Sequence, residues 1–124
     1  CPPGDTFSIA DEYFLGVFWD DLNPGAAGDV YYQTLGGPGD HRFVVQWDVP
    51  FFGGDLGDLL RVQAVLRESG GIDVCYVDTT SAANFGNNGA GAAAGIMRDA
   101  VTGFSYSCSL PDLTAGLQLL YLPV

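Results

Sequence analysis

Residues 59–77 read LLRVQAVLRESGGIDVCYV, and this stretch decides the fold. The first half, 59–67, carries apolar side chains at every second position, which is the repeat of a β-strand with one buried face. A helix also fits these residues, but two glycines follow and a second strand-like run, 72–77, resumes at once. Glu68–Gly71 therefore predicts a tight hairpin between two antiparallel strands. The pattern places Leu60, Val62, Ala64 and Leu66 on one face of the strand, and the opposite face carries Arg61, Gln63, Val65 and Arg67.

The same alternation extends outward from this hairpin. Residues 42–49 (RFVVQWDV) place Phe43, Val45, Trp47 and Val49 on one face. Further strand-like runs stand at 13–19, 30–34, 103–108 and 117–122, separated by turn-rich stretches such as Asp20–Asp29 and Gly36–Asp40. We predict an all-β single domain over residues 1–124. Its expected fold is a jelly-roll-like antiparallel β-sandwich of about eight short strands.

Residues 81–95 (SAANFGNNGAGAAAG) are small and low in complexity. The alanines alone would favour a helix, but each interleaved glycine costs about 1 kcal/mol in a helix interior. We expect a flexible loop there.

The charge balance excludes several classes of function. The chain has 124 residues, 15 acidic side chains and 4 basic ones, all Arg, for a net charge of −11. Nucleic acids and anionic membrane surfaces need clustered basic residues, so neither is an expected partner. Without Lys, Schiff-base and P-loop chemistry are excluded. No apolar run approaches the roughly 20 residues of a transmembrane helix, so no transmembrane segment is expected.

The three cysteines predict an oxidising compartment. Cys75 and Cys108 both lie in strand-like runs, and we expect a disulfide between them; the alternative is two buried free thiols. The chain starts at Cys1 rather than Met, which we interpret as processing or excision. Cys1 is then left over. It could carry a lipid, pair with another chain or remain a free thiol.

Six segments occur in an order that resembles the extracellular β-sandwich module related to the nidogen N-terminal domain. They are Phe18–Leu22 (FWDDL), Gly28–Tyr32 (GDVYY), Arg42–Trp47 (RFVVQW), Val62–Tyr76 (VQAVLRESGGIDVCY), Ala94–Ile96 (AGI) and Gly103–Ser107 (GFSYS). The resemblance spans about residues 14–122. It implies a secreted, extracellular or cell-surface location, since similar modules recur in secreted and surface proteins of bacteria.

The chain departs from that pattern at its start. Such modules carry upstream strands that end in an Asn–Gly turn, whereas only Cys1–Glu12 precede the FWDDL segment here. We therefore expect a sandwich that is open along one edge and is completed by a strand from a neighbouring chain. The residues 1–5 (CPPGD) and 119–124 (LLYLPV) are the segments that would cross to a neighbour. The alternative is a smaller, closed sandwich with ordinary termini.

A calcium site is the candidate for metal binding. Asp20 and Asp21 follow Trp19 at a strand end, Asp29 closes the same loop, and Ca²⁺ takes six to eight oxygen ligands. The alternative is that these carboxylates cap backbone N–H groups in a turn. No other cofactor is expected.

Catalysis is not expected. His41, the single His, lies beside Arg42 after a turn, and no serine has the context of an activated nucleophile. Only two Glu residues are present, Glu12 and Glu68.

The aromatic content suggests contact surfaces instead. Phe51 and Phe52, in a loop after Pro50, are candidate contact residues, as are Leu120, Tyr121 and Leu122 near the C-terminus. Exposed aromatic rings could also form a stacking platform for carbohydrate.

Two functions follow from these features. The first is a non-catalytic extracellular structural or adhesion module that associates with copies of itself or with another extracellular protein, as the subunit of a surface filament or matrix. The second is a Ca²⁺- or carbohydrate-binding accessory domain of a larger secreted enzyme.

Overall fold

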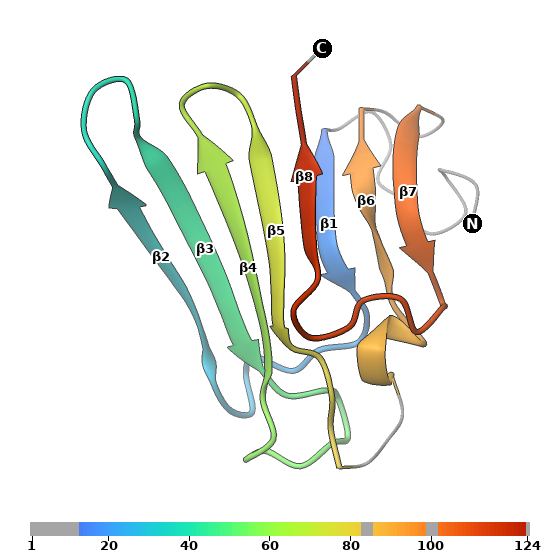
Figure 1. Ribbon diagram of the computed structural model, residues 1–124. Coiled ribbons are helices and arrows are strands. Elements are labelled where there is room, and N and C mark those ends of the chain that lie inside the picture. The colour runs from blue at the N-terminus through green and yellow to red at the C-terminus, as the bar shows by residue number, and fades with distance from the viewer. Residues whose placement is uncertain (1–12, 83–85, 99–101, 124) are drawn as a thin grey trace.

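The computed structural model describes residues 13–82, 86–98 and 102–123, and it is an all-β structure of two antiparallel sheets, as predicted (Figure 1). The larger sheet has the order β2-β3-β4-β5-β8, and the smaller has the order β1-β6-β7. The strand bounds are Phe14–Trp19 for β1, Asp29–Leu35 for β2, Arg42–Val49 for β3, Leu60–Arg67 for β4, Ile72–Asp78 for β5, Ala93–Met97 for β6, Gly103–Cys108 for β7 and Gln118–Tyr121 for β8.

The predicted hairpin is confirmed. Strands β4 and β5 pair in antiparallel register, with Leu66 opposite Ile72 and Ala64 opposite Val74. The turn closes through a bond from the Gly70 N–H to the Arg67 carbonyl, at 2.8 Å. Gly70 has a φ of +90°, a backbone conformation that L side chains rarely adopt, which explains a glycine at this position.

Strand β6 corrects the sequence analysis, which predicted a flexible loop over 81–95. Ala93 and Ala94 are fully buried, and a Cβ on Gly95 would lie 2.3 Å from the Phe104 carbonyl oxygen. Small residues are therefore required where β6 lies between β1 and β7. Before β6, Asn87–Gly89 form a short 3-10 turn.

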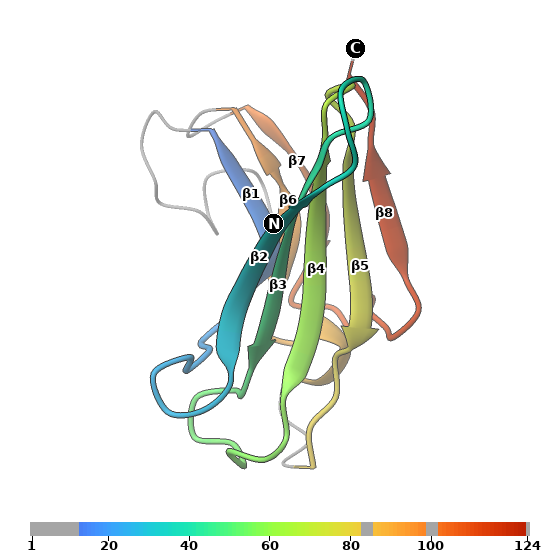
Figure 2. The same cartoon turned by 90° about the vertical axis from the view of Figure 1, so that its left-hand side faces the viewer.

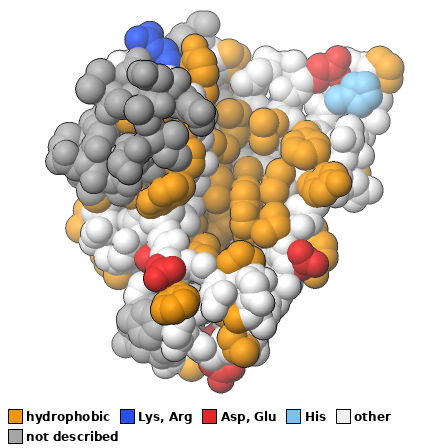
Figure 3. Space-filling model, turned by 180° about the vertical axis from the view of Figure 1, so that it is seen from behind, with side chains coloured by type: hydrophobic (Ala, Val, Ile, Leu, Met, Phe, Trp, Pro, Cys, Tyr) orange, Lys and Arg blue, Asp and Glu red, His pale blue; other side chains and the backbone are white. Residues whose placement is uncertain are grey.

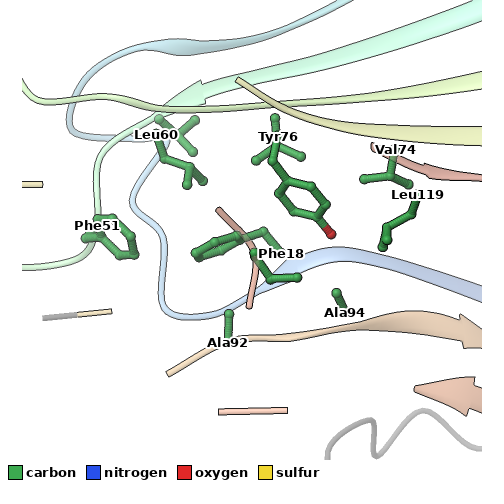
Figure 4. Close-up of a cluster of buried hydrophobic side chains, with 11 residues drawn as sticks. Phe18, Phe51, Leu60, Val74, Tyr76, Ala92, Ala94 and Leu119 are labelled. Atoms are coloured by element: carbon green, nitrogen blue, oxygen red, sulfur yellow. The ribbon is translucent and has the colours of Figure 1, made fainter. Parts of the chain in front are cut away.

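The core fills the space between the two sheets (Figure 4). The rings of Phe18 and Phe51 pack edge to face, with their centroids 5.8 Å apart. The buried residues of this core are Phe18, Val49, Phe51, Leu60, Val62, Val74, Tyr76, Ala92, Ala94, Leu113 and Leu119.

One hydrogen bond of this core joins the sheets directly. The Tyr76 hydroxyl, on β5, donates to the Val17 carbonyl, on β1, at 2.7 Å. Tyr76 is 1% exposed, and this burial raises the pKa of its phenol. The bond holds β1 against β5 of the larger sheet.

We expect Tyr76→Phe to lower the free energy of unfolding by about 1–3 kcal/mol, because the Val17 carbonyl would lose a buried donor. Urea unfolding followed by circular dichroism measures this. Tyr121→Phe is the matched control, since the buried Tyr121 hydroxyl has no hydrogen-bond partner among the described residues. Equal losses in both variants would contradict a special role for the Tyr76 bond.

Candidate functional site

The inner face of β2 and β3 is the most unusual surface of the molecule. The smaller sheet packs over β4, β5, β8 and the Trp47–Val49 end of β3, whereas β2 and the Phe43 end of β3 stand clear of it (Figures 1 and 2). Four large apolar side chains of this region are 38–76% exposed: Val30, Tyr32, Phe43 and Leu66. We call the set Val30, Tyr32, Phe43, Val45, Trp47 and Leu66 the open face.

Strand register explains why these residues share one face. Tyr32 pairs with Val45 and Val30 pairs with Trp47, so their side chains point to the same side of the sheet. Phe43 pairs with Leu66 in the same way. The rings of Tyr32 and Phe43 lie 5.9 Å apart. Seen from behind, hydrophobic side chains gather in a hollow (Figure 3).

One strand edge borders the open face. Within the described residues, β2 pairs on one side only, with β3. Every residue of β2 is exposed. A groove of about 200 Å³ runs along β1, lined by Phe14–Trp19 and by Trp47. Unpaired strand edges present backbone N–H and C=O groups to another chain.

The outer face of the larger sheet is polar by contrast. The Arg61 guanidinium donates to both carboxylate oxygens of Asp48, at 2.8 and 2.9 Å. This ion pair lowers the pKa of Asp48. Gln46 donates to the same carboxylate, and Gln63 donates to Gln46 at 2.8 Å. These bonds satisfy the central polar side chains within the protein.

A second groove, of about 400 Å³, lies on this outer face near the β2 edge. It combines exposed aromatic and aliphatic surface with amide side chains. Its lining residues are Tyr31, Tyr32, Gln33, Leu35, Val44, Gln46 and Gln63.

The predicted Cys75–Cys108 disulfide is wrong. Cys75 is a free thiol, and Cys108 is disulfide-bonded to a different residue. Cys75 follows the inward-facing Val74 on β5, so its side chain points to the outer face, whereas Cys108 is on β7 of the other sheet. Cys1 lies outside the described residues.

The environment of Cys75 gives a testable reactivity. Partial burial, followed by the negative charge of Asp73, raises the pKa of its thiol. We expect Cys75, but not Cys108, to be alkylated by iodoacetamide without reductant, and more slowly in the native protein than in urea at the same pH. Peptide mass spectrometry identifies the labelled site. A peptide that joins Cys75 to Cys108 would contradict the structure.

The predicted calcium site is not formed. The Asp20 carboxylate accepts the Asp21 N–H, and the Asp29 carboxylate accepts the Val30 N–H, both at 2.8 Å. In the described part of the chain, no three His, Cys, Asp or Glu side chains gather in a way that could hold a metal ion. Capping of nearby backbone, the alternative interpretation, describes Asp20 and Asp29.

The predicted contact residues differ in their exposure to solvent. Phe51 is 2% exposed and packs in the core, so its prediction as a surface residue is wrong; its loop folds inward because Phe51 forms a β-bridge with Leu22. Phe52, Leu120 and Leu122 are exposed, whereas Tyr121 packs against the core. Residues 118–121 form β8, which pairs with β5 of its own chain.

His41 contacts Glu68 and helps to connect two turns of the larger sheet. Its Nδ1 lies 3.1 Å from Glu68 Oε2, and the same oxygen accepts the backbone N–H groups of Gly39 and His41 at 2.9 Å. These bonds tie the β2–β3 connection to the β4–β5 hairpin. The backbone bonds lower the pKa of Glu68.

Sequence reasoning missed the open face as a site. The alternation in 42–49 placed Phe43 and Val45 on the same face as Trp47, but alternation alone does not show whether an opposing sheet covers that face. To predict the open face one would need to know how many strands the opposing sheet contains. That number depends on which distant segments pair.

The two packed antiparallel sheets, with an uncovered apolar face, define a β-sandwich module. No helix in the described ranges is long and apolar enough to cross a membrane. The chain belongs to the NIDO-related family: the family model described as NIDO related matches residues 5–118. The expected resemblance to nidogen-type modules is therefore confirmed at the level of the family. Neither the curated proteins nor the solved structures contain a match.

Proposed function

We propose that this protein is a non-catalytic, extracellular structural or adhesion module that associates with copies of itself through the open face. Membership of the NIDO-related family supports the extracellular and non-catalytic parts of the proposal. The observation that carries the self-association is the exposed apolar surface of Val30, Tyr32, Phe43 and Leu66, beside the edge of β2, which in the described part of the chain pairs only with β3.

The energetics favour a moderate association. Full burial of one large apolar side chain contributes about 1.5–3 kcal/mol. Four such side chains, Val30, Tyr32, Phe43 and Leu66, are partly exposed on the open face. Association costs about 4–15 kcal/mol in lost freedom, so backbone pairing at the strand edges must add to the apolar term.

Charge limits where copies can meet. Each chain carries a net charge of −11, which repels a second copy over most of the surface. The open face contains no acidic or basic residue. Contact there leaves the carboxylates in water, and added salt should strengthen it by screening the repulsion.

We expect Tyr32→Asp to weaken self-association at least tenfold, because Tyr32 is 76% exposed on the open face and a carboxylate there would be desolvated on contact. Sedimentation velocity over a range of concentrations measures this. The matched control is Phe52→Asp, which removes an exposed aromatic ring from a loop away from this face.

Thermal melting of dilute protein checks that both variants keep the fold. Unchanged association in Tyr32→Asp, or a wild-type protein that is monomeric up to high concentration, would contradict the proposal.

The groove on the outer face supports a second function, carbohydrate binding. Tyr31 is 53% exposed, and the amides of Gln33, Gln46 and Gln63 line the same groove. A flat ring beside amide groups suits a sugar, which offers both an apolar face and hydroxyl groups. The charge of −11 favours neutral glycans over acidic ones.

We expect Tyr31→Ala to abolish binding to any neutral oligosaccharide that an array identifies for the wild-type protein. Titration calorimetry measures the affinity. Tyr13→Ala removes another exposed tyrosine, outside the groove, and should bind like the wild type. Absence of glycan binding by the wild-type protein would remove this second function.

A further inference from the structure

We infer that two copies of this protein pair edge to edge through β2, with Tyr32 of each copy at a twofold axis, so that two five-stranded sheets join into one continuous sheet. This inference rests on the proposed self-association and specifies the strand that mediates it.

Strand β2 lacks the features that usually protect the edge of a sheet. Proline, lysine, bulges and short length commonly prevent an edge strand from pairing with another chain. Residues 29–35 (DVYYQTL) contain neither proline nor lysine, and their register with β3 is continuous over all seven residues. At the opposite edge of this sheet, β8 has four residues, and Pro123 follows it closely. The β2 edge is therefore the better template for a second chain.

The hydrogen bonds of the larger sheet show which backbone groups of β2 bond to β3. The Glu68 N–H donates to the His41 carbonyl, and the β3–β4 register continues from this pair. In an antiparallel ladder, successive residues bond alternately to the neighbour on one side and on the other. Arg42 and every second residue after it therefore bond to β2. Their partners in β2 are Asp29, Tyr31, Gln33 and Leu35.

The backbone N–H and C=O groups of the other three residues, Val30, Tyr32 and Thr34, point away from β3. The Val30 N–H agrees with this assignment, because it donates to the Asp29 carboxylate at 2.8 Å. Every residue of β2 is exposed, so these backbone groups are accessible along the whole edge. The edge thus offers three residues, centred on Tyr32, for pairing with a further strand.

A second copy of β2 matches this pattern. Antiparallel pairing about a twofold axis at Tyr32 places Tyr32 opposite Tyr32, and Val30 of each copy opposite Thr34 of the other. These three residue pairs exchange two N–H···O=C bonds each, and the Val30 N–H releases Asp29 to do so. A shift of two residues in either direction places an outward residue opposite one beyond the end of β2. The register centred on Tyr32 therefore makes the most hydrogen bonds.

Charge favours the same register. Asp29 is the one charged residue of β2, and it lies opposite Leu35 of the second copy. The two Asp29 carboxylates are then about six residues apart along the strands, or roughly 20 Å. This separation exceeds the screening length of about 8 Å at physiological ionic strength. Two chains of charge −11 can therefore meet along β2 with little local repulsion.

The pairing also joins the two open faces into one. Tyr32 of each copy lies beside Tyr32 of the other, and each ring already lies 5.9 Å from the ring of Phe43. Aromatic pairs across neighbouring strands stabilise a sheet. In the described part of the chain, the smaller sheet extends from β1 away from β2, so it leaves the approach to this edge open (Figure 1).

The size of the contact indicates a reversible dimer. The seven residues of β2 span roughly 23 Å. A contact along one strand edge lies at the low end of specific interfaces, so measurements should cover about 1–500 µM protein.

Amide hydrogen exchange, followed by NMR on the intact protein at low and high concentration, tests the pairing. We expect the amides of Tyr32 and Thr34 to gain protection at least tenfold as the mass doubles, because they acquire acceptors in the second copy. The amides of Tyr31 and Gln33 should gain less, since they already donate to β3. Equal gains at all four amides, or no gain at Tyr32 and Thr34, would overturn the edge pair but leave self-association standing. A monomer at every concentration would overturn both.

A proline variant separates edge pairing from contact through side chains alone. Thr34→Pro removes an outward N–H, and edge strands tolerate proline where that N–H faces solvent. We expect sedimentation velocity to show at least tenfold weaker dimerisation, because each copy loses one donor while the residues of the open face are unchanged. Thr34→Ala keeps the N–H and should dimerise like the wild type. Melting of dilute protein checks the fold, and dimerisation of wild-type strength by folded Thr34→Pro protein would overturn the edge pair.

Discussion

The position of the smaller sheet depends on the Tyr76 hydroxyl, which donates to the Val17 carbonyl across the core. This bond, with Phe18 and Leu60 packed beside it, holds β1 over β4 and β5. In the described part of the chain the smaller sheet has three strands and extends from β1 away from β2, so it covers neither β2 nor the Phe43 end of β3. The open face is thus a consequence of where one tyrosine anchors one strand.

Alternation along the strands then gives the two faces of the larger sheet different chemistry. On the outer face, Asp48 and Arg61 neutralise each other and the glutamines bond beside them. That side needs no cover, since its polar groups are satisfied there. On the inner face, the same strands present Tyr32 and Phe43 without a matching layer. Exposure of such an apolar surface to water is unfavourable in free energy, and burial against an associating partner removes this penalty.

Local pattern was sufficient to predict most strands, and the reasons for the failures are physical. The β4–β5 hairpin could be predicted because its apolar period and turn residues agree. Strand β6 could not, because Ala93–Gly95 have little apolar contrast and are small for steric reasons that involve Phe104. The disulfide prediction failed because it ignored the face to which Cys75 points. The open face required knowledge of which strands lack a partner, and such long-range pairing leaves no local mark in the sequence.

Tolerance to substitution is unevenly distributed over the fold. Gly95 and Gly103 leave no room for a side chain where β6 and β7 pair. The close packing of these two strands therefore restricts both positions to glycine. Strand β2 is exposed along its whole length, and its residues contribute little to the stability of the single chain. The strand that borders the open face is therefore also the strand most free to change. Such a protein can acquire new binding preferences during evolution with little risk of unfolding.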